Sequence, residues 1–241
     1  MQEKIEGIVL NVRKYNDKNC IVTLFTRSRG RLSFISPAGT GKAANARRAR
    51  LQPLSVVSSD LTFKPGVELQ RLGSVSLREV WSDIYFNPSK RATTIFLSEF
   101  LSRLLNTSMP EENLYDFLIE ALRVFDRSQD GGIDFHIPLL VSLLSYTGIL
   151  PDVSTYRKGK VFDFTTGTFQ WPDDASPLSL SEEDSRFVRL VTKINFVNIQ
   201  RLRLGSSNRR RILYGLLNFY SYHFPGLSTL KSPEILRELF E

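Results

Sequence analysis

The spacing of apolar residues changes once along this chain, near residue 80, and that change limits the folds open to it. Before it, short runs rich in Val, Ile, Phe and Thr partly alternate with polar residues, which is typical of β-strands. After it, apolar residues recur every three or four positions, which is typical of amphipathic helices. We therefore predict an α+β protein with two domains, residues 1–80 and 81–241.

The N-terminal part holds five predicted strands separated by turn residues. Ser28-Arg29-Gly30 forms a tight turn between the second and third, and Lys64-Pro65-Gly66 does so between the fourth and fifth. A longer irregular segment separates the third strand from the fourth. Five short strands in this arrangement predict a small Greek-key barrel of the OB type. The predicted strands cover residues 5–15, 20–27, 31–36, 54–63 and 68–80.

The C-terminal part reads as an all-α domain with one interruption. Asn87-Pro88 places a helix cap before a proline in the first turn, and residues 114–125 carry a regular apolar stripe. Thr166-Gly167, between two short aromatic runs, predicts a small β-hairpin within residues 155–172. Further helices are expected near residues 134–147, 181–195, 207–222 and 232–240.

The composition indicates the cellular compartment in which this protein works. Of the 241 residues, 41% are hydrophobic, which is enough for a substantial core, and a single cysteine allows no internal disulfide. No apolar run approaches the length of a membrane span, and the acidic start MQEKIEGIVL does not resemble a signal peptide. We expect a cytoplasmic protein without membrane contact.

The positive charge is concentrated in the N-terminal part. The chain has a net charge of +7, yet residues 1–80 alone contain 14 Lys and Arg against 6 Asp and Glu. Residues 13–50 contain ten basic residues and one acid, Asp17. A segment of one sign predicts a binding surface for a polyanion, although a basic surface without any partner is the plainer alternative.

The fragment AGTGK at residues 38–42 raises the alternative of a nucleotide-binding loop. A P-loop needs a first glycine where this chain has Ser36, and a Ser or Thr where it has Ala43. The spacing Gly39-x-Gly41-x-x-Ala44 fits a loose dinucleotide fingerprint, but what precedes it reads as an antiparallel hairpin. We therefore favour a basic arm on a flexible, Ala- and Gly-rich loop, and predict no nucleotide cofactor.

The basic arm and the hairpin turn before it supply the candidate phosphate contacts. Arg29 and Arg31 flank the turn and are expected to project beyond the barrel. Of the aromatic residues that could stack on bases, Phe25 and Phe34 are expected in the core, which leaves Tyr15 and Phe63. The candidate DNA-binding residues are Lys14, Lys18, Arg27, Arg29, Arg31, Lys42, Arg47, Arg48 and Arg50.

Nothing else in the sequence favours catalysis. His136 and His223 lie in apolar helical surroundings typical of core or interface residues, and Cys20 opens a strand as a small buried side chain. One cysteine and two distant histidines do not match a zinc spacing. We predict a protein that is not an enzyme, with no catalytic residue, no metal and no cofactor.

Three stretches resemble one known family. KIEGIVLNVRKYNDKNCIVTLFTRSRGRLSFISPAG resembles the opening of bacterial RecO, a recombination mediator in DNA repair, and RRARLQPLSVVSSDLTFKPGVELQRLGSVSL continues the resemblance. YSYHFPGLSTLKSPEILRELF resembles the closing motif of the family. The resemblance implies an OB domain followed by a helical domain, which agrees with the periodicity.

The resemblance also implies a function. It implies binding to single- and double-stranded DNA, annealing of complementary strands, and work with RecR and the C-terminal tail of single-stranded DNA-binding protein, so that RecA can load. Many relatives carry a four-cysteine zinc module, whose counterpart here, within residues 151–172, has no cysteine. Zinc is therefore not expected, and the hairpin must depend on its aromatic residues: Tyr156, Phe162, Phe164, Phe169 and Trp171.

A dock for that acidic, apolar-ended tail needs an apolar groove with a basic rim. Basic residues at a helix start oppose the helix dipole, so either an acidic ligand or an acidic neighbour such as Glu234 or Glu238 would explain them. An RNA-binding or adaptor protein without annealing activity stays open as the alternative function. The candidate partner-binding residues are Arg201, Arg203, Arg209, Arg210 and Arg211.

Overall fold

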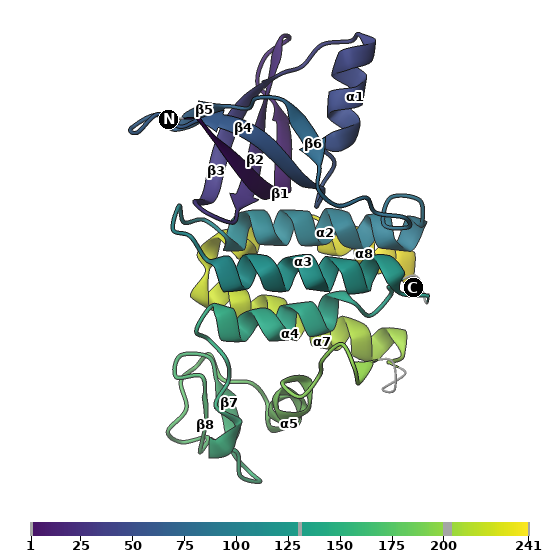
Figure 1. The fold of residues 1–241 in the computed structure, drawn as a ribbon. Helices are drawn as coiled ribbons and strands as arrows, with labels where there is room; N and C mark the ends of the chain where they lie inside the picture. The colour runs from purple at the N-terminus through teal and green to yellow at the C-terminus, as the bar shows by residue number, and fades with distance from the viewer. Residues whose placement is uncertain (1, 130–131, 200–203, 241) are drawn as a thin grey trace. The chain divides into compact units, whose positions relative to one another are not determined.

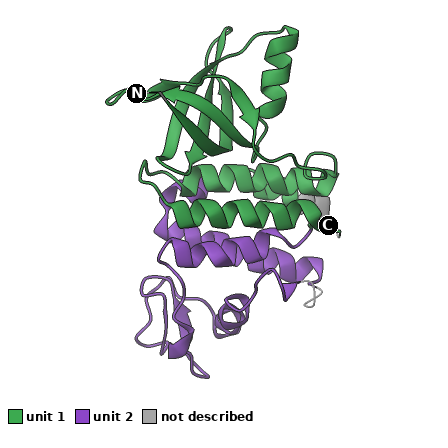
Figure 2. Cartoon of the chain, in the orientation of Figure 1, with its two compact units in different colours: residues 1–132, 230–239 green, residues 133–229, 240–241 purple. Residues whose placement is uncertain are grey.

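The computed structural model describes residues 2–129, 132–199 and 204–240, and Figure 1 shows the course of the chain. The chain divides into two compact units, which Figure 2 colours separately. The first unit contains residues 1–132 and 230–239, and the second contains residues 133–229 and 240–241.

The first unit begins with a curled β-sheet that carries one short helix. In its long first strand the consecutive residues Ile8, Val9 and Leu10 are all buried, so both faces of the strand are covered there, whereas residues 11–14 are exposed. The elements are β1 (Gln2–Lys14), β2 (Asn19–Thr26), β3 (Gly30–Pro37), α1 (Lys42–Arg50), β4 (Val56–Thr62), β5 (Leu69–Arg71) and β6 (Val75–Leu77).

The sheet has the strand order β5-β3-β2-β1-β4-β6. Strand β1 pairs antiparallel with both β2 and β4, and β3 pairs in parallel with β5. This Greek-key pairing, with a helix between the third and fourth strands, is an OB-like half-barrel, as the sequence predicted. Figure 1 shows α1 standing beside the sheet.

The predicted fifth strand is in fact two strands. The chain turns at Gly73, where a side-chain Cβ would lie 2.5 Å from the carbonyl oxygen of Asp60. Strand β5 therefore pairs with β3, while β6 crosses to pair with β4. The residues on both sides of Gly73 are typical of strands. The sequence pattern therefore predicted one continuous strand across residues 68–80.

The barrel core confirms part of the sequence analysis. Phe25 and Phe34 are both buried, as expected. Leu51, the residue after α1, also lies in this core and holds the end of the helix against the sheet. The core cluster consists of Ile5, Val9, Val22, Leu24, Phe34, Leu51, Val57, Leu61, Leu72 and Val75.

The helices of the first unit are α2 (Pro88–Leu104), α3 (Glu112–Arg127) and α8 (Pro233–Phe240). The predicted cap is confirmed, because the Asn87 side chain accepts hydrogen bonds from the backbone N–H groups of Ser89 and Lys90. Helix α3 buries the predicted stripe, which includes Leu118 and Leu122. Helix α2 contacts the barrel through Ser98, whose hydroxyl donates to the carbonyl of Leu10 at 2.6 Å.

A buried lysine joins the start of α2 to the end of α3. The Lys90 side chain is fully buried, and its Nζ lies 2.7 Å from a carboxylate oxygen of Asp83. It also donates to the carbonyls of Asp126 (2.9 Å) and Ser128 (2.7 Å). The Asp126 carboxylate in turn accepts the backbone N–H of Ile84 at 3.0 Å. Each charge in this cluster therefore has partners, which is what makes its burial tolerable.

The second unit is helical with one hairpin, again as predicted. Gly167, in the predicted turn, has a φ of +66°, which suits a residue without a side chain. Helix α5 ends at Val191, earlier than the apolar pattern indicated. The elements are α4 (His136–Tyr146), a short 3₁₀ turn (Val153–Thr155), β7 (Val161–Asp163), β8 (Thr168–Gln170), α5 (Glu182–Val191), α7 (Ser206–His223) and a second 3₁₀ turn (Pro225–Thr229).

Candidate nucleic-acid interface

The nine candidate phosphate contacts fall at two ends of the barrel. The register of β2 and β3 pairs Asn19 with Pro37 at one end and Thr26 with Gly30 at the other. Lys14 and Lys18, in the β1–β2 hairpin, lie at the first end, beside the cations of α1: Lys42, Arg47, Arg48 and Arg50. The turn set lies at the second end: Arg27, Arg29 and Arg31.

The turn set is engaged in interactions within the first unit. Arg27 pairs with Glu112 at 2.9 Å and Asp116 at 3.0 Å, both on α3. Arg29 pairs with Glu3 at 2.8 Å, and its guanidinium lies 4.1 Å from the ring centre of Phe63. These side chains already have anionic or aromatic partners, so a phosphate would have to compete for them.

The expectation that the turn projects freely beyond the barrel is wrong. Arg31 donates to the carbonyls of Ser102 (2.7 Å) and Leu105 (3.4 Å) at the end of α2, and burial lowers its pKa. A Cβ on Gly30 would lie 2.2 Å from the carbonyl oxygen of Met109. The hairpin itself is confirmed, but the turn residues do not reveal that the 107–109 segment packs against them.

The basic arm is a helix rather than a flexible loop. No side chain of α1 is fully buried, so the helix has no apolar stripe to predict it. Its attachment is polar: Arg47 donates to the Ser36 hydroxyl at 2.7 Å and to the carbonyls of Leu72 (3.0 Å) and Gly73 (2.8 Å). Burial lowers the pKa of Arg47. Arg47 therefore holds α1 against the sheet.

Other cations of this end face solvent. Arg48 is exposed and reaches only the carbonyl of Gly39 at 3.2 Å and Asn45 at 3.5 Å. Arg50 donates to the carbonyl of Val75 at 3.3 Å. The basic residues in the last turn of α1 suit the negative end of the helix dipole, so their charge stabilises the helix that displays them.

Both lysines of the β1–β2 hairpin are also exposed. Lys14 pairs with Asp17 at 2.7 Å, but their side chains are 74% and 94% exposed, so this pair contributes little. Tyr15, between them, is 57% exposed. Lys14, Lys18, Lys42 and Arg48 thus form an exposed cationic set on one end of the barrel, which we call the groove cations.

Two of the groove cations, Lys14 and Arg48, line a cavity of about 370 Å³ between α1 and the end of the sheet. Sequence reasoning identified its charged rim and missed its walls, which have no sequence signature. Cys20, expected in the core, is half-buried and lines this groove. The lining residues are Val12, Lys14, Asn16, Asp17, Cys20, Pro37, Ala38, Gly39, Thr40, Ala44, Arg47, Arg48 and Leu51.

The strand pairing around α1 contradicts the alternative of a dinucleotide-binding site at Gly39-x-Gly41-x-x-Ala44. A dinucleotide site needs a helix that crosses between parallel neighbouring strands. Helix α1 instead leads from β3 to β4, and β4 pairs antiparallel with β1. Gly39 and Gly41 lie in the connection between the end of β3 and the start of the short surface helix α1.

Comparison with known proteins identifies the family of this chain. The family model described as "Recombination protein O N terminal" matches residues 1–81, and "Recombination protein O C terminal" matches residues 87–233. The chain is 32% identical over 241 residues to the DNA repair protein RecO of Flavobacterium psychrophilum, with 100% of both chains covered. The chain belongs to the RecO family.

Other RecO relatives match over the same length. The DNA repair protein RecO of Bacteroides fragilis is 29% identical over 243 residues, with 100% of both chains covered. The DNA repair protein RecO of Porphyromonas gingivalis is 30% identical over 241 residues, with 98% of each covered. The chain is therefore a DNA repair and recombination protein of the RecO family. Within its described ranges, none of the helices combines the length and apolarity of a bilayer crossing.

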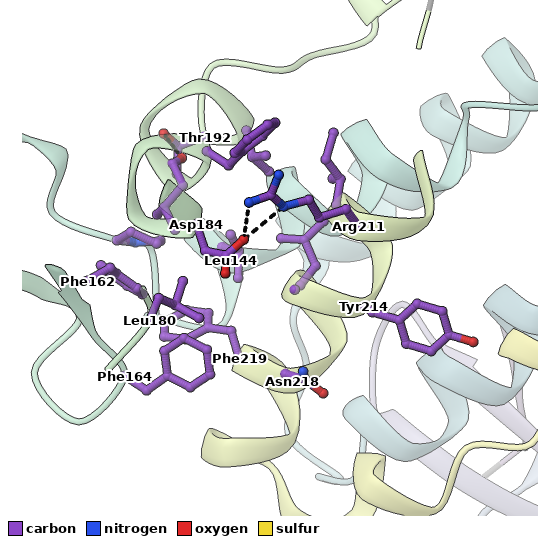
Figure 3. Close-up of a pocket in the computed structure, with 17 residues that line it drawn as sticks. Leu144, Phe162, Phe164, Leu180, Asp184, Thr192, Arg211, Tyr214, Asn218 and Phe219 are labelled. Carbon is purple, nitrogen blue, oxygen red and sulfur yellow. Dashed lines mark hydrogen bonds and ion pairs between the residues drawn. The ribbon is translucent and has the colours of Figure 1, made fainter. Parts of the chain in front are cut away.

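The second unit of this RecO chain contains an apolar pocket of about 290 Å³, shown in Figure 3. It lies between the β7–β8 hairpin, α5 and α7, and its apolar walls include Phe162, Phe164 and Phe219. Arg211 and Asp184 form a charged pair on its wall, drawn with dashed lines in Figure 3.

The predicted partner-binding arginines have acidic neighbours within the second unit. Arg211 donates to Asp184 at 2.8 Å and to Glu183 at 3.0 Å, and its guanidinium lies 4.2 Å from the ring centre of Phe187. Arg209 pairs with Asp134 and has a side chain only 11% exposed.

Acidic neighbours therefore explain why Arg209 and Arg211 are tolerated at the start of a helix. These neighbours are Asp134, Glu183 and Asp184 rather than Glu234 or Glu238, the two acids considered from the sequence. Arg210 is exposed, although it too interacts within the protein. Arg201 and Arg203 lie outside the described residues.

The hairpin region does not have the ligands for the zinc module that the sequence analysis attributed to many relatives. Residues 151–172 contain neither cysteine nor histidine, so they offer no soft ligand for zinc. Within the described ranges, no three or more His, Cys, Asp or Glu side chains gather as metal ligands would. Phe162 and Phe169 are buried, with ring centres 5.2 Å apart, whereas Trp171, also expected to support the hairpin, is 51% exposed.

A buried carboxylate organises the same hairpin. Asp163 is 2% exposed and accepts hydrogen bonds from Thr165 (2.7 Å) and Ser176 (2.7 Å). Burial opposes its ionisation, but the hydrogen bonds from Thr165 and Ser176 outweigh burial and lower the pKa to about 2. Because the folded-state pKa is depressed, the ionised carboxylate stabilises the fold above its unfolded pKa.

We expect this stabilisation to disappear as the pH falls from about 4 towards 2, with a loss of about 2 kcal/mol from this one group. The measurement is urea unfolding of the wild-type protein and of Asp163→Asn across that pH range. The variant should be the less stable at pH 7 and should show a flatter acid limb. Asp174→Asn, at an exposed position, is the matched control. Parallel acid limbs for wild type and Asp163→Asn would contradict the assignment.

Proposed function

We propose that this chain is a DNA-binding recombination mediator. In this proposal it binds single- and double-stranded DNA through the groove cations and anneals complementary strands. With RecR it helps RecA load onto DNA covered by single-stranded DNA-binding protein. The observation that carries the proposal is the exposed cationic end of the OB-like barrel, because cations that lack buried partners can neutralise phosphates and release counterions.

The proposal includes no catalytic step. Binding through phosphate groups is largely independent of sequence, which suits a protein that must act at any gap. Annealing requires only that the protein hold two complementary strands together while it neutralises the charges of their phosphates. We accordingly assign no cofactor and no catalytic residue, and we place the protein in the cytoplasm beside the nucleoid.

The test is an annealing assay with two complementary oligonucleotides, one of which carries a fluorophore quenched on pairing. The protein should accelerate pairing at low salt, and the acceleration should fall as salt rises. Single-stranded RNA of the same sequence should be bound in parallel. Tight RNA binding with no acceleration of annealing would favour the RNA-binding or adaptor alternative and contradict our proposal.

For the partner, we propose that the pocket of the second unit receives the acidic, apolar-ended tail of single-stranded DNA-binding protein. An apolar end would lie in the pocket against Phe164 and Phe219, and a carboxylate would reach Arg211. The existing pair with Glu183, whose side chain is 74% exposed, is the weaker of the two pairs of Arg211 and would yield to the peptide.

Two substitutions should therefore move the affinity for a tail peptide in opposite directions. Arg211→Ala should weaken it about 10-fold, the effect of removing one charge-assisted hydrogen bond, and Glu183→Gln should strengthen it by removing a competitor. Arg186→Ala, which breaks an exposed pair with Glu182 on α5, is the matched control. Fluorescence anisotropy with a labelled tail peptide gives the affinities, and DNA binding should stay unchanged. Equal peptide affinity for all four proteins would refute this site.

A further inference from the structure

The groove beside α1 has walls suited to a flat, partly apolar guest. Its volume, about 370 Å³, lies at the small end of the range for ligand sites. Val12, Pro37, Ala38, Ala44 and Leu51 supply apolar surface. The polar lining side chains are Asn16, Asp17, Thr40 and the cations Lys14, Arg47 and Arg48.

Small residues keep this groove open. Gly39 follows the end of β3, and a Cβ placed there would lie 3.4 Å from the Cβ of Ala44 on α1. The connection is held in place by Ala38, whose backbone N–H donates to the carbonyl of Lys18 at 2.8 Å. A larger side chain at 38, 39 or 44 would occupy part of this space, because all three residues line the groove.

We propose that this groove receives one unpaired nucleobase of a single-stranded nucleic acid, with its flanking phosphates on Lys14 and Arg48. The inference rests on the proposed function and adds to it a preference for single strands. A base within a duplex is stacked and paired, and it must be turned out before it can enter such a hollow. Binding through phosphates alone would serve single and double strands alike.

Charge and shape together favour a nucleotide over other guests. The interior walls are apolar, as a base face requires, while cations stand at the rim where phosphates would lie. The one acid in the lining, Asp17, is 94% exposed and already paired with Lys14. Tyr15, next to Asn16 of the groove and 57% exposed, offers a ring on which a neighbouring base can stack.

The first test fills the groove from α1. Ala44→Phe places a ring in the cavity, and Ala46→Phe places the same ring on the exposed face of the helix. We expect Ala44→Phe to weaken binding of a single-stranded 12-mer about 10-fold while duplex binding changes less than about twofold. Ala46→Phe should change neither. Equal effects of Ala44→Phe on single and double strands would overturn the base pocket.

The second test uses the unaltered protein, so a misfolded variant cannot confuse it. Cys20 is the single cysteine of the chain, and its half-buried thiol lines the groove. Saturating single-stranded 12-mer should slow alkylation of Cys20 by a maleimide at least about 5-fold, the protection given by a bound base with low micromolar affinity at saturating concentration. A saturating duplex should leave the alkylation rate near that of the free protein.

The outcomes separate this inference from the proposed function. Binding of both nucleic acids with equal protection of Cys20, or with none, overturns the base pocket and leaves the mediator proposal intact. Failure to bind either nucleic acid overturns the proposed function as well. RNA of the same sequence forms a further arm: protection by both DNA and RNA supports a pocket that reads the base, and protection by DNA alone adds selection of the sugar. Protection by an acidic peptide but by no oligonucleotide refutes the inference.

Discussion

Replacement of Lys90 by methionine should destabilise the protein by about 3 kcal/mol, the cost of breaking a buried, hydrogen-bonded ion pair. The Lys90 side chain is fully buried, and its three donors are taken by Asp83, Asp126 and Ser128. Methionine fills most of the volume but leaves the two carbonyls without a donor, and an unmet buried acceptor is costly. The measurement is the free energy of unfolding from urea titration at pH 7.

The matched control lies one residue further along α2. Arg91→Met removes a cation from an exposed position and should change stability by less than about 0.5 kcal/mol. If Lys90→Met also cost less than about 1 kcal/mol, the cluster would not hold α2 to α3 as its hydrogen bonds indicate. The slope of the unfolding free energy against urea must be unchanged for this comparison to be valid.

The largest effect on binding is expected from Lys14, Lys18 and Arg48 replaced together by alanine. Each is exposed, and none is needed for the core, so folding should be preserved. Because the variant would neutralise about three fewer phosphates, its affinity for single-stranded DNA should fall by about two orders of magnitude at low salt. Arg47 is left out deliberately, since its removal would release α1 as well as a charge.

The control for this variant is Arg27→Ala at the other end of the barrel. That arginine pairs with Glu112 and Asp116, so its removal takes away one positive charge without touching the groove. It should change DNA affinity less than about twofold, after its effect on stability has been checked by thermal unfolding. A loss of affinity as large as that of the triple variant would move the interface to the turn set.

Regular elements could be predicted from the sequence because their signals are local. The Asn87 cap and the stripe of α3 are spaced within one helix, and the turn at Gly167 is fixed by adjacent residues. Helix α1 could not be predicted in the same way. None of its side chains is fully buried, and what holds it is the reach of Arg47 to residues 36, 72 and 73.

The candidate site was predicted only in part, for the same reason. Charge density located the basic end of the barrel, but it did not separate the exposed Arg48 from Arg31, which bonds to the end of α2. A buried lysine such as Lys90 contradicts the usual preference of its type. The groove is formed by small residues from three segments, and their closeness is a property of the fold rather than of any motif.

The central claim is that the groove cations bind nucleic acid through its phosphates, and the salt dependence of binding tests it most directly. The affinity for a single-stranded oligonucleotide should be measured from about 50 to 200 mM salt for three proteins: wild type, the Lys14, Lys18 and Arg48 triple variant, and Arg27→Ala. We expect the slope of log K against log salt to fall by roughly 2 for the triple variant, at about 0.7 for each phosphate no longer neutralised, and to stay near the wild-type slope for Arg27→Ala. An unchanged slope in the triple variant would contradict the account.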